Sequence, residues 1–189
     1  MNKTTDMTTS KLPETSVIIL EGPDGVGKST AAKSLSNWTG WDLFHMGQPD
    51  EDFNYASDYF ASHNIKHNCV LDRFHLGALV YGRICRLHPH RVTDETLLYT
   101  QLRLKYEYNA QVIVMYFEDA RAYARHIREL AGKRDELFDP AQCVLVNESY
   151  RRIAGLLGPA TKSEIVLWPV DRLGYPDEEV IQKWAVSKS

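Results

Sequence analysis

The stretch that decides the fold is Val17-Ile-Ile-Leu-Glu-Gly-Pro-Asp-Gly-Val-Gly-Lys-Ser-Thr30. Residues 17–20 are an unbroken apolar run, which is typical of a parallel strand buried on both faces. Gly22 opens the pattern Gly-x-x-x-x-Gly-Lys-Ser, and the polar, alanine-containing run 29–38 that follows predicts a helix. Strand, glycine-rich loop and helix in this order are the context of a phosphate-binding P-loop. The stretch therefore predicts a nucleotide site.

The residue types of this loop indicate how phosphate would be held. Glycines let backbone N–H groups turn inward without a Cβ in the way, and the helix start adds unpaired N–H groups at the positive end of its dipole. Lys28 can reach the outer phosphates, and the Ser29 hydroxyl can ligate Mg²⁺. The residues expected to bind the nucleotide are Gly22, Gly25, Val26, Gly27, Lys28, Ser29 and Thr30.

Length and composition indicate one intracellular globular domain. The chain has 189 residues, of which 43% are hydrophobic and 11% aromatic, with a net charge of −3. A broad nucleic-acid surface is not expected at this charge, and no apolar run is long enough to cross a bilayer. We expect a disordered polar tail over 1–15, a single domain over 16–189, a cytoplasmic location and buried, reduced cysteines.

Further apolar runs alternate with helical patterns. Strands are predicted at 41–46, 68–72, 111–117 and 165–170, and helices at 55–63, 74–87, 93–108, 120–130, 140–157 and 177–184. This alternation is typical of a parallel, doubly wound sheet, which binds ligands at the carboxyl ends of its strands. The ends of the first, third and fourth strands should bring Asp24, Asp72 and Glu118 to one edge.

Two charged segments could serve the phosphates. Asp72-Arg73 ends a predicted strand, where the carboxylate could hold Mg²⁺ and the guanidinium a second phosphate; the alternative is a surface ion pair. Arg125, Arg128, Lys133 and Arg134 surround a helix break at Gly132. A lid over about 125–138 that closes on the phosphates is one interpretation, and a solvated basic face is the other.

With these motifs in place, the chain resembles the thymidylate kinase family as a divergent member. Glu21-Gly-x-Asp-Gly-x-Gly-Lys-Ser-Thr30 is similar to the family's E-G-x-D-G-x-G-K-S-T, Asp72-Arg73-Phe74 to its D-R-Y/F, and Arg134-x-Glu136 to part of its lid. The resemblance implies a three-layer α/β/α P-loop fold with a five-stranded parallel sheet and a short basic lid. It also implies transfer of the γ-phosphoryl group of ATP to dTMP, with Mg²⁺, in a homodimer.

The resemblance assigns roles residue by residue. It gives catalytic roles to Lys28, Asp24, Arg73 and Arg134, and adds Arg125 to the ATP contacts. It gives Mg²⁺ binding to Ser29 and Asp72. It gives contacts with the acceptor to Asp24, Arg73, Phe74 and Tyr81. The chain departs from the family where Gly77 and Gly82 replace a serine and a glutamine, and where His45-Met-Gly-Gln-Pro49 replaces T-R-E-P-G-G. These changes predict a roomier base pocket.

Two other functions remain open. A deoxynucleoside kinase shares the scaffold and would use a glutamate at the place of Glu21 as its base. A nucleotide-dependent switch or binding protein is the non-enzymatic alternative. A GTP switch would need Asn-Lys-x-Asp after a strand, and the nearest string, Thr161-Lys-Ser-Glu164, precedes its strand and ends in Glu.

Overall fold

The computed structural model describes residues 17–47, 65, 68–85, 92–131 and 139–170. The tail over 1–15, the helices predicted at 55–63 and 177–184, and the predicted lid residue Arg134 lie outside these ranges.

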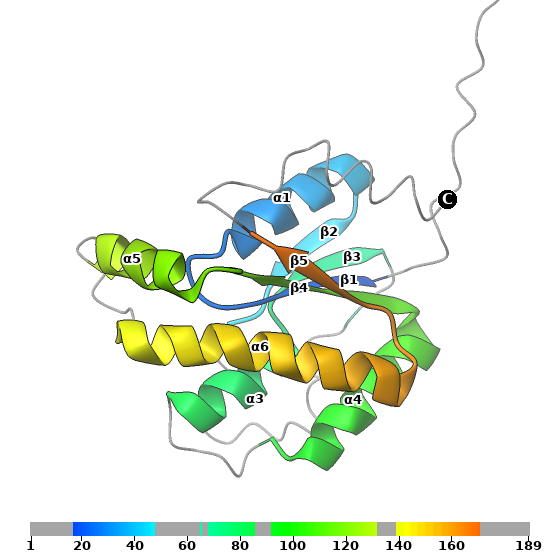
Figure 1. Ribbon diagram of the computed structural model, residues 1–189. Coiled ribbons are helices and arrows are strands. Elements are labelled where there is room, and N and C mark those ends of the chain that lie inside the picture. The colour runs from blue at the N-terminus through cyan, green and yellow to red at the C-terminus, as the bar shows by residue number, and fades with distance from the viewer. Residues whose placement is uncertain (1–16, 48–64, 66–67, 86–91, 132–138, 171–189) are drawn as a thin grey trace, which may run out of the picture.

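Five parallel strands form the centre of the molecule (Figure 1). They are β1 (Val17–Glu21), β2 (Asp42–His45), β3 (Cys69–Asp72), β4 (Ala110–Tyr116) and β5 (Ile165–Pro169), in the sheet order β2-β3-β1-β4-β5. Because β1 lies between β3 and β4, the carboxyl ends of these three strands are neighbours, as the sequence predicted. The five-stranded parallel sheet is therefore confirmed.

Alternation along β1 builds two hydrophobic cores, one on each face of the sheet. Val17 and Ile19 belong to one buried cluster, and Ile18 and Leu20 to the other. Successive side chains of a strand point to opposite faces, so a strand covered on both sides must be apolar throughout. All five residues of β1 are buried.

Helices cover both faces of the sheet, which gives the predicted three layers. Figure 1 shows α1 (Lys28–Thr39) on one side and α3 (His75–Ile84), α4 (Asp94–Tyr108) and α6 (Pro140–Thr161) on the other. The helix α5 (Ala120–Ala131) follows β4 and lies where the strands end. The residues that begin α1 and α3 therefore meet at one edge of the sheet.

The prediction that the helix over 140–157 stops before Gly158-Pro159 was wrong. Helix α6 continues to Thr161, with Pro159 inside it. The Thr161 hydroxyl donates to the Leu157 carbonyl at 2.7 Å, and Lys162 then ends the helix in a left-handed conformation. These end contacts hold the last turn although the proline has no N–H to donate.

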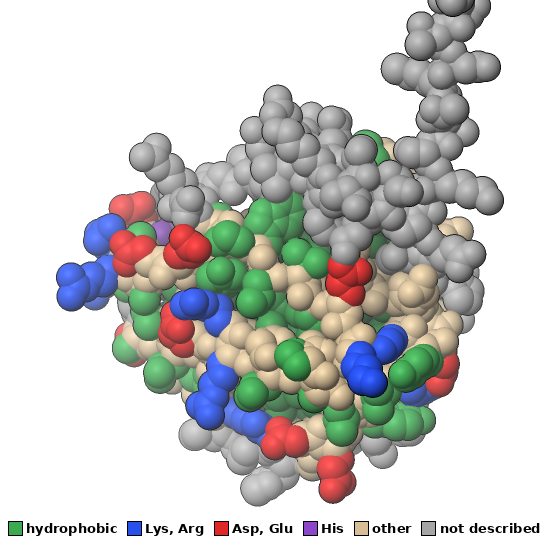
Figure 2. Space-filling model, turned by 45° about the vertical axis from the view of Figure 1, so that its right-hand side comes forward, with side chains coloured by type: hydrophobic (Ala, Val, Ile, Leu, Met, Phe, Trp, Pro, Cys, Tyr) green, Lys and Arg blue, Asp and Glu red, His purple; other side chains and the backbone are tan. Residues whose placement is uncertain are grey.

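The surface of the described residues carries no continuous basic area on the face that Figure 2 shows, where acidic and basic side chains are interspersed. Among these residues, no helix is both long and apolar enough to cross a membrane. The three cysteines form no disulfide; Cys69 and Cys143 are buried as predicted, and Cys85 is only partly buried. An apolar groove of about 550 Å³ lies between α3, α4 and α6 and includes no residue of the glycine-rich loop.

Candidate active site

The glycine-rich loop connects β1 to α1, and its glycines are required by close approach and by backbone angle. A Cβ on Gly22 would lie 2.2 Å from the Met115 carbonyl oxygen, and its φ is +142°. A Cβ on Gly25, whose φ is +77°, would lie 2.9 Å from Leu130 Cδ1 of α5. The loop is therefore packed between β4 and α5, and only glycine fits at these two positions without a shift.

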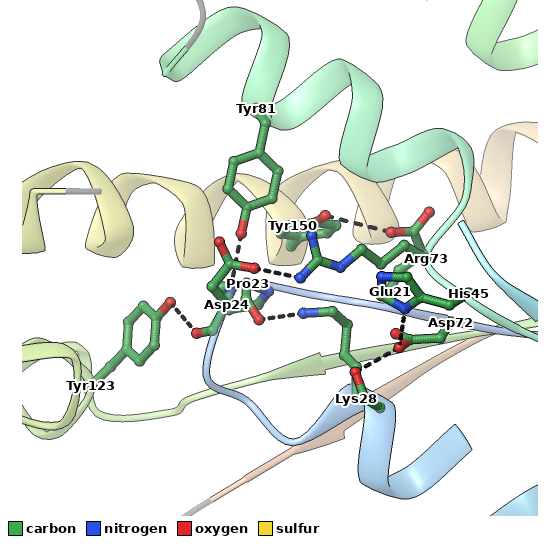
Figure 3. A network of polar contacts seen from close by, with 11 residues as sticks. Glu21, Pro23, Asp24, Lys28, His45, Asp72, Arg73, Tyr81, Tyr123 and Tyr150 are labelled. Atoms are coloured by element: carbon green, nitrogen blue, oxygen red, sulfur yellow. Dashed lines mark hydrogen bonds and ion pairs between the residues drawn. The ribbon is translucent and has the colours of Figure 1, made fainter. Parts of the chain in front are cut away.

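The start of α1 offers free donors to an anion. Its N-cap is Gly27, and no side chain caps this end. The first N–H groups of the helix are thus left for a ligand, at the positive end of the dipole. Lys28 Nζ donates to the Pro23 carbonyl at 2.5 Å (Figure 3). Burial lowers the pKa of Lys28 from 10.5 to about 8, and the charge of Arg73 acts in the same direction.

Ser29 and Asp72 lie together at the carboxyl ends of β1 and β3. The Ser29 hydroxyl donates to Asp72 Oδ2 at 2.6 Å, while Asp72 Oδ1 is buried and has no hydrogen-bond partner among the described residues. Hydroxyl and carboxylate oxygens are the ligands that Mg²⁺ prefers, usually beside water and substrate phosphates. An unpartnered buried carboxylate oxygen costs free energy unless a ligand satisfies it. The pair therefore fits a nucleotide-bound Mg²⁺.

No larger metal cage accompanies this pair in the described part of the chain. Within the described ranges, no group of three or more His, Cys, Asp or Glu residues is placed to hold an ion. A divalent ion at Ser29 and Asp72 would thus share its remaining positions with phosphate and water, as in other phosphate-dependent Mg²⁺ sites.

Arg73 turns back towards the glycine-rich loop. Its φ is +74°, which is unusual for a residue with a side chain. Its N–H donates to the Leu20 carbonyl at 2.9 Å, and its Nη2 donates to Asp24 Oδ1 at 2.8 Å. Strained residues of this kind concentrate at functional sites. The conformation places the Arg73 side chain, which is 39% exposed, beside Asp24 of the glycine-rich loop.

Glu21 ends β1 and holds the start of α3. Its Oε1 accepts from the N–H groups of Phe74 at 3.0 Å and Leu76 at 2.9 Å, and its Oε2 accepts from the Tyr150 hydroxyl at 3.4 Å. The side chain is fully buried, and burial raises its pKa from 4.5 to about 7 although the backbone donors act in the opposite direction. A Cβ on Gly77 would lie 3.1 Å from the Tyr150 hydroxyl, so the space beside this glycine is already occupied.

Two tyrosines from opposite sides fix the backbone of Asp24. The Asp24 N–H donates to the Tyr81 hydroxyl of α3 at 2.9 Å, and the Tyr123 hydroxyl of α5 donates to the Asp24 carbonyl at 2.8 Å (Figure 3). His126 Nε2 lies 3.1 Å from the Gly25 carbonyl oxygen. Burial raises the pKa of Tyr81 and of Tyr123, so both hydroxyls stay neutral. The loop is thus held in shape before any ligand binds.

The structure brings most of the predicted site residues to one edge of the sheet. Lys28, Ser29, Asp72, Arg73 and Asp24 are joined by the contacts above. Val26 is buried, Thr30 is half-buried on α1, and Phe74 is buried in the core cluster beside Tyr81. Arg125 is exposed on α5 and Glu118 is exposed after β4. Arg134 lies outside the described residues, so the predicted lid is described only up to residue 131.

The comparisons with known proteins agree with this architecture. No family model and no curated protein matches the chain. The YorR protein from Bacillus subtilis, solved in complex with phosphorylated GDP, is 21% identical, with a TM-score of 0.63 over 91% of this chain and 94% of that one. Deoxyadenosine kinase from M. mycoides, with bound dCTP, is 17% identical, with a TM-score of 0.52 over 90% of this chain and 99% of that one.

The chain has the fold of the P-loop kinases. A thymidylate kinase from Candida albicans also matches, at 14% identity and a TM-score of 0.43, over 90% of each chain. A likeness this distant carries no argument for that family. These likenesses show the fold alone.

Several residues of the site were not predicted from the sequence. His45 lies against Asp72, Tyr123 and His126 hold the loop, and Tyr150 faces Glu21. For three of these residues the sequence carries no signal, because they come from α5 and α6 and reach the site only through helix packing. His45 could have been found, because it lies one residue before the end of the predicted strand 41–46, which precedes the strand predicted to end in Asp72.

Proposed function

We propose that this protein transfers the γ-phosphoryl group of ATP to a deoxynucleoside monophosphate, with dTMP as the first acceptor to test. The observation that carries the proposal is the pair of cations at the loop. Lys28 lies inside it, and Arg73 lies at its mouth, held on Asp24 at 2.8 Å. One cation suits the transferring phosphate and the other an acceptor phosphate.

Charge favours a monophosphate over a nucleoside as the acceptor. With a second pKa of about 6, a phosphate monoester is mostly a dianion at neutral pH and needs no base to attack. The negative charge of the acceptor phosphate must instead be neutralised beside ATP. Arg73 supplies the positive charge once the Asp24 side chain releases it and turns towards the acceptor. Glu21, the base that a nucleoside kinase would need, is engaged by two backbone N–H groups and is fully buried.

In the proposed reaction, an acceptor phosphate oxygen forms a bond to the γ-phosphorus while the bond from that phosphorus to the β–γ bridging oxygen breaks. Lys28 leaves the Pro23 carbonyl for the phosphates, and the N–H groups at the start of α1 donate to the polyphosphate oxygens. Mg²⁺, held by Ser29 and Asp72, would neutralise charge on the phosphate oxygens when bound. Tyr81 and Tyr123 keep the Asp24 backbone in place throughout.

The lid, the base pocket and the assembly complete the proposal. If Arg134 acts on the transition state, Arg134→Ala should lower kcat more than it raises KM for ATP, and Arg125→Ala tests the same role for α5.

Phe74 and Tyr81 would line the acceptor site, and we expect turnover of more than one pyrimidine deoxynucleotide. The homodimer implied by the resemblance is tested by light scattering after gel filtration.

A deoxynucleoside kinase is the second candidate, and the raised pKa of Glu21 favours it. A carboxyl with a pKa of about 7 is poised to take a proton from a 5′-hydroxyl at neutral pH. Under this alternative, Glu21 would have to release the N–H groups of α3 or use Oε2, which now accepts only from Tyr150.

A single coupled assay of ADP formation separates the two. The acceptors are dTMP, dUMP, dCMP, thymidine and deoxyadenosine, each tested with wild type, Arg73→Ala and Glu21→Gln. The proposal expects turnover of dTMP and none of thymidine, with Arg73→Ala losing more activity than Glu21→Gln. Thymidine turnover as fast as that of dTMP, together with an inactive Glu21→Gln, would transfer the assignment to the nucleoside kinase. If no acceptor leads to ADP formation, a nucleotide switch would be favoured.

A further inference from the structure

His45 is placed beside Asp72 by the pairing of two strands. Strands β2 and β3 are parallel, and His45 is the register partner of Asp72 at the carboxyl end of both. Register partners of neighbouring strands have side chains on the same face, about 4.8 Å apart. The backbone continues the pairing, because the Met46 N–H donates to the Asp72 carbonyl at 3.0 Å. The position of His45 is thus set by the sheet and not by a mobile loop.

The contact between the two side chains is short and asymmetric. His45 Nδ1 lies 2.8 Å from Asp72 Oδ2, the oxygen that also accepts from the Ser29 hydroxyl at 2.6 Å. An ionised carboxylate can only accept, so Nδ1 carries the hydrogen. The His45 side chain is 59% exposed, whereas that of Asp72 is 3% exposed. The imidazole therefore contacts the carboxylate from the solvent side.

Two donors on the same oxygen fix the plane of the carboxylate and leave the other oxygen for a ligand. Oδ2 is engaged by Ser29 and His45, while Oδ1 is buried without a partner among the described residues. Among the described residues, loss of His45 would leave the Ser29 hydroxyl as the only side chain that hydrogen-bonds this carboxylate. Partners of this kind, behind the atoms that touch a metal, commonly set its affinity.

We propose that His45 is a positioning residue that orients Asp72 towards the divalent ion accompanying the nucleotide. The inference rests on the proposed function, since that function supplies the ion. The inference adds to the proposed function a residue outside the glycine-rich loop, at the end of the exposed strand β2. His45 itself acts through Asp72 and needs no contact with the ion.

The test measures binding of Mn²⁺ as a probe of the divalent site, by the electron paramagnetic resonance signal of free Mn²⁺ in the presence of a non-hydrolysable ATP analogue. The variants are His45→Ala, which removes the donor, and His45→Asn, whose amide nitrogen can replace Nδ1. Asp42→Asn, at the other end of β2, is the matched control. Analogue binding in EDTA, followed by calorimetry, reports the nucleotide site without metal, and thermal melts report folding.

We expect His45→Ala to weaken Mn²⁺ binding about 10–100-fold, the usual effect of losing such a partner. His45→Asn should stay within about threefold of wild type, and analogue binding in EDTA should be the same in all four proteins. Wild-type affinity in His45→Ala, or equal losses in the alanine and asparagine variants, would overturn the inference while leaving the proposed function intact. Failure of wild type to bind the analogue at all would overturn the proposed function and the inference with it.

Discussion

Glu21→Gln should remove a pH dependence of stability that the burial of this carboxyl creates. The glutamine carbonyl can still accept from the N–H groups of Phe74 and Leu76, so the start of α3 keeps its partner. What is lost is the titration. Burial raises the pKa of Glu21 from 4.5 to about 7, which means that the folded protein holds its proton more tightly than the unfolded chain does.

The sign and the size of the effect follow from linkage. Between pH 4.5 and 7 the unfolded chain has lost the proton and the folded protein has kept it, so the free energy of unfolding falls as the pH rises. At about 1.4 kcal/mol for each tenfold change in proton affinity, the full loss is about 3 kcal/mol. Glu21 is fully buried, so water does not screen this effect.

A wild-type curve alone would hide this loss because His75 titrates in the opposite direction. Burial lowers the pKa of His75 from 6.5 to about 4, although its hydrogen bond to Gln101 acts against this. Its contribution to stability therefore disappears as the pH falls through the same range. Subtracting the wild-type curve from that of Glu21→Gln cancels His75 and isolates Glu21.

The assay is urea unfolding at half-unit steps from pH 4.5 to 8, followed by circular dichroism. The difference in unfolding free energy between Glu21→Gln and wild type should grow by about 3 kcal/mol in favour of the variant and level off above pH 7. Glu129→Gln, an exposed change on α5, should show no such trend. A difference that stays constant within about 0.5 kcal/mol would refute the argument that Glu21 is protonated in the folded protein at low pH.

Three further predictions concern the loop. Gly22→Ala should abolish nucleotide binding and lower the melting temperature, because its Cβ would lie 2.2 Å from the Met115 carbonyl; near-normal binding in calorimetry would contradict the packing of the loop on β4. Tyr123→Phe removes the 2.8 Å hydrogen bond to the Asp24 carbonyl and should weaken ATP binding about fivefold, at about 1 kcal/mol of net hydrogen-bond energy; an unchanged affinity would show that Tyr81 alone suffices. Nucleotide binding should take up a proton at Lys28, whose pKa is about 8 in the empty protein. Calorimetry in buffers of different ionisation enthalpy should give an uptake of about three-quarters of a proton at pH 8.5 and about one-quarter at pH 7.5, and equal uptake at both would refute it.

The positions of the strands and their parallel direction could be predicted from the sequence, whereas their order in the sheet comes from the structure. Residues 17–20 are apolar without interruption, and a strand of this kind belongs inside a parallel sheet. The glycine-rich loop could also be predicted, because its pattern consists of glycines and polar residues adjacent in the chain. The end of α6 could not, since the hydroxyl of Thr161 and a left-handed Lys162 hold a turn that Pro159 would weaken.

The sequence by itself determined the β1–loop–α1 unit, the five parallel strands and the edge where Asp24 and Asp72 meet, because each depends on local patterns and on the geometry of parallel sheets. Only the tertiary structure decided what the side chains at that edge do. Glu21 reaches 53 residues along the chain to Phe74, His45 reaches 27 to Asp72, and Tyr123 reaches 99 back to Asp24. The physical reason is that a hydrogen bond across such distances depends on how helices and strands pack. No periodicity or motif within a single element encodes that packing.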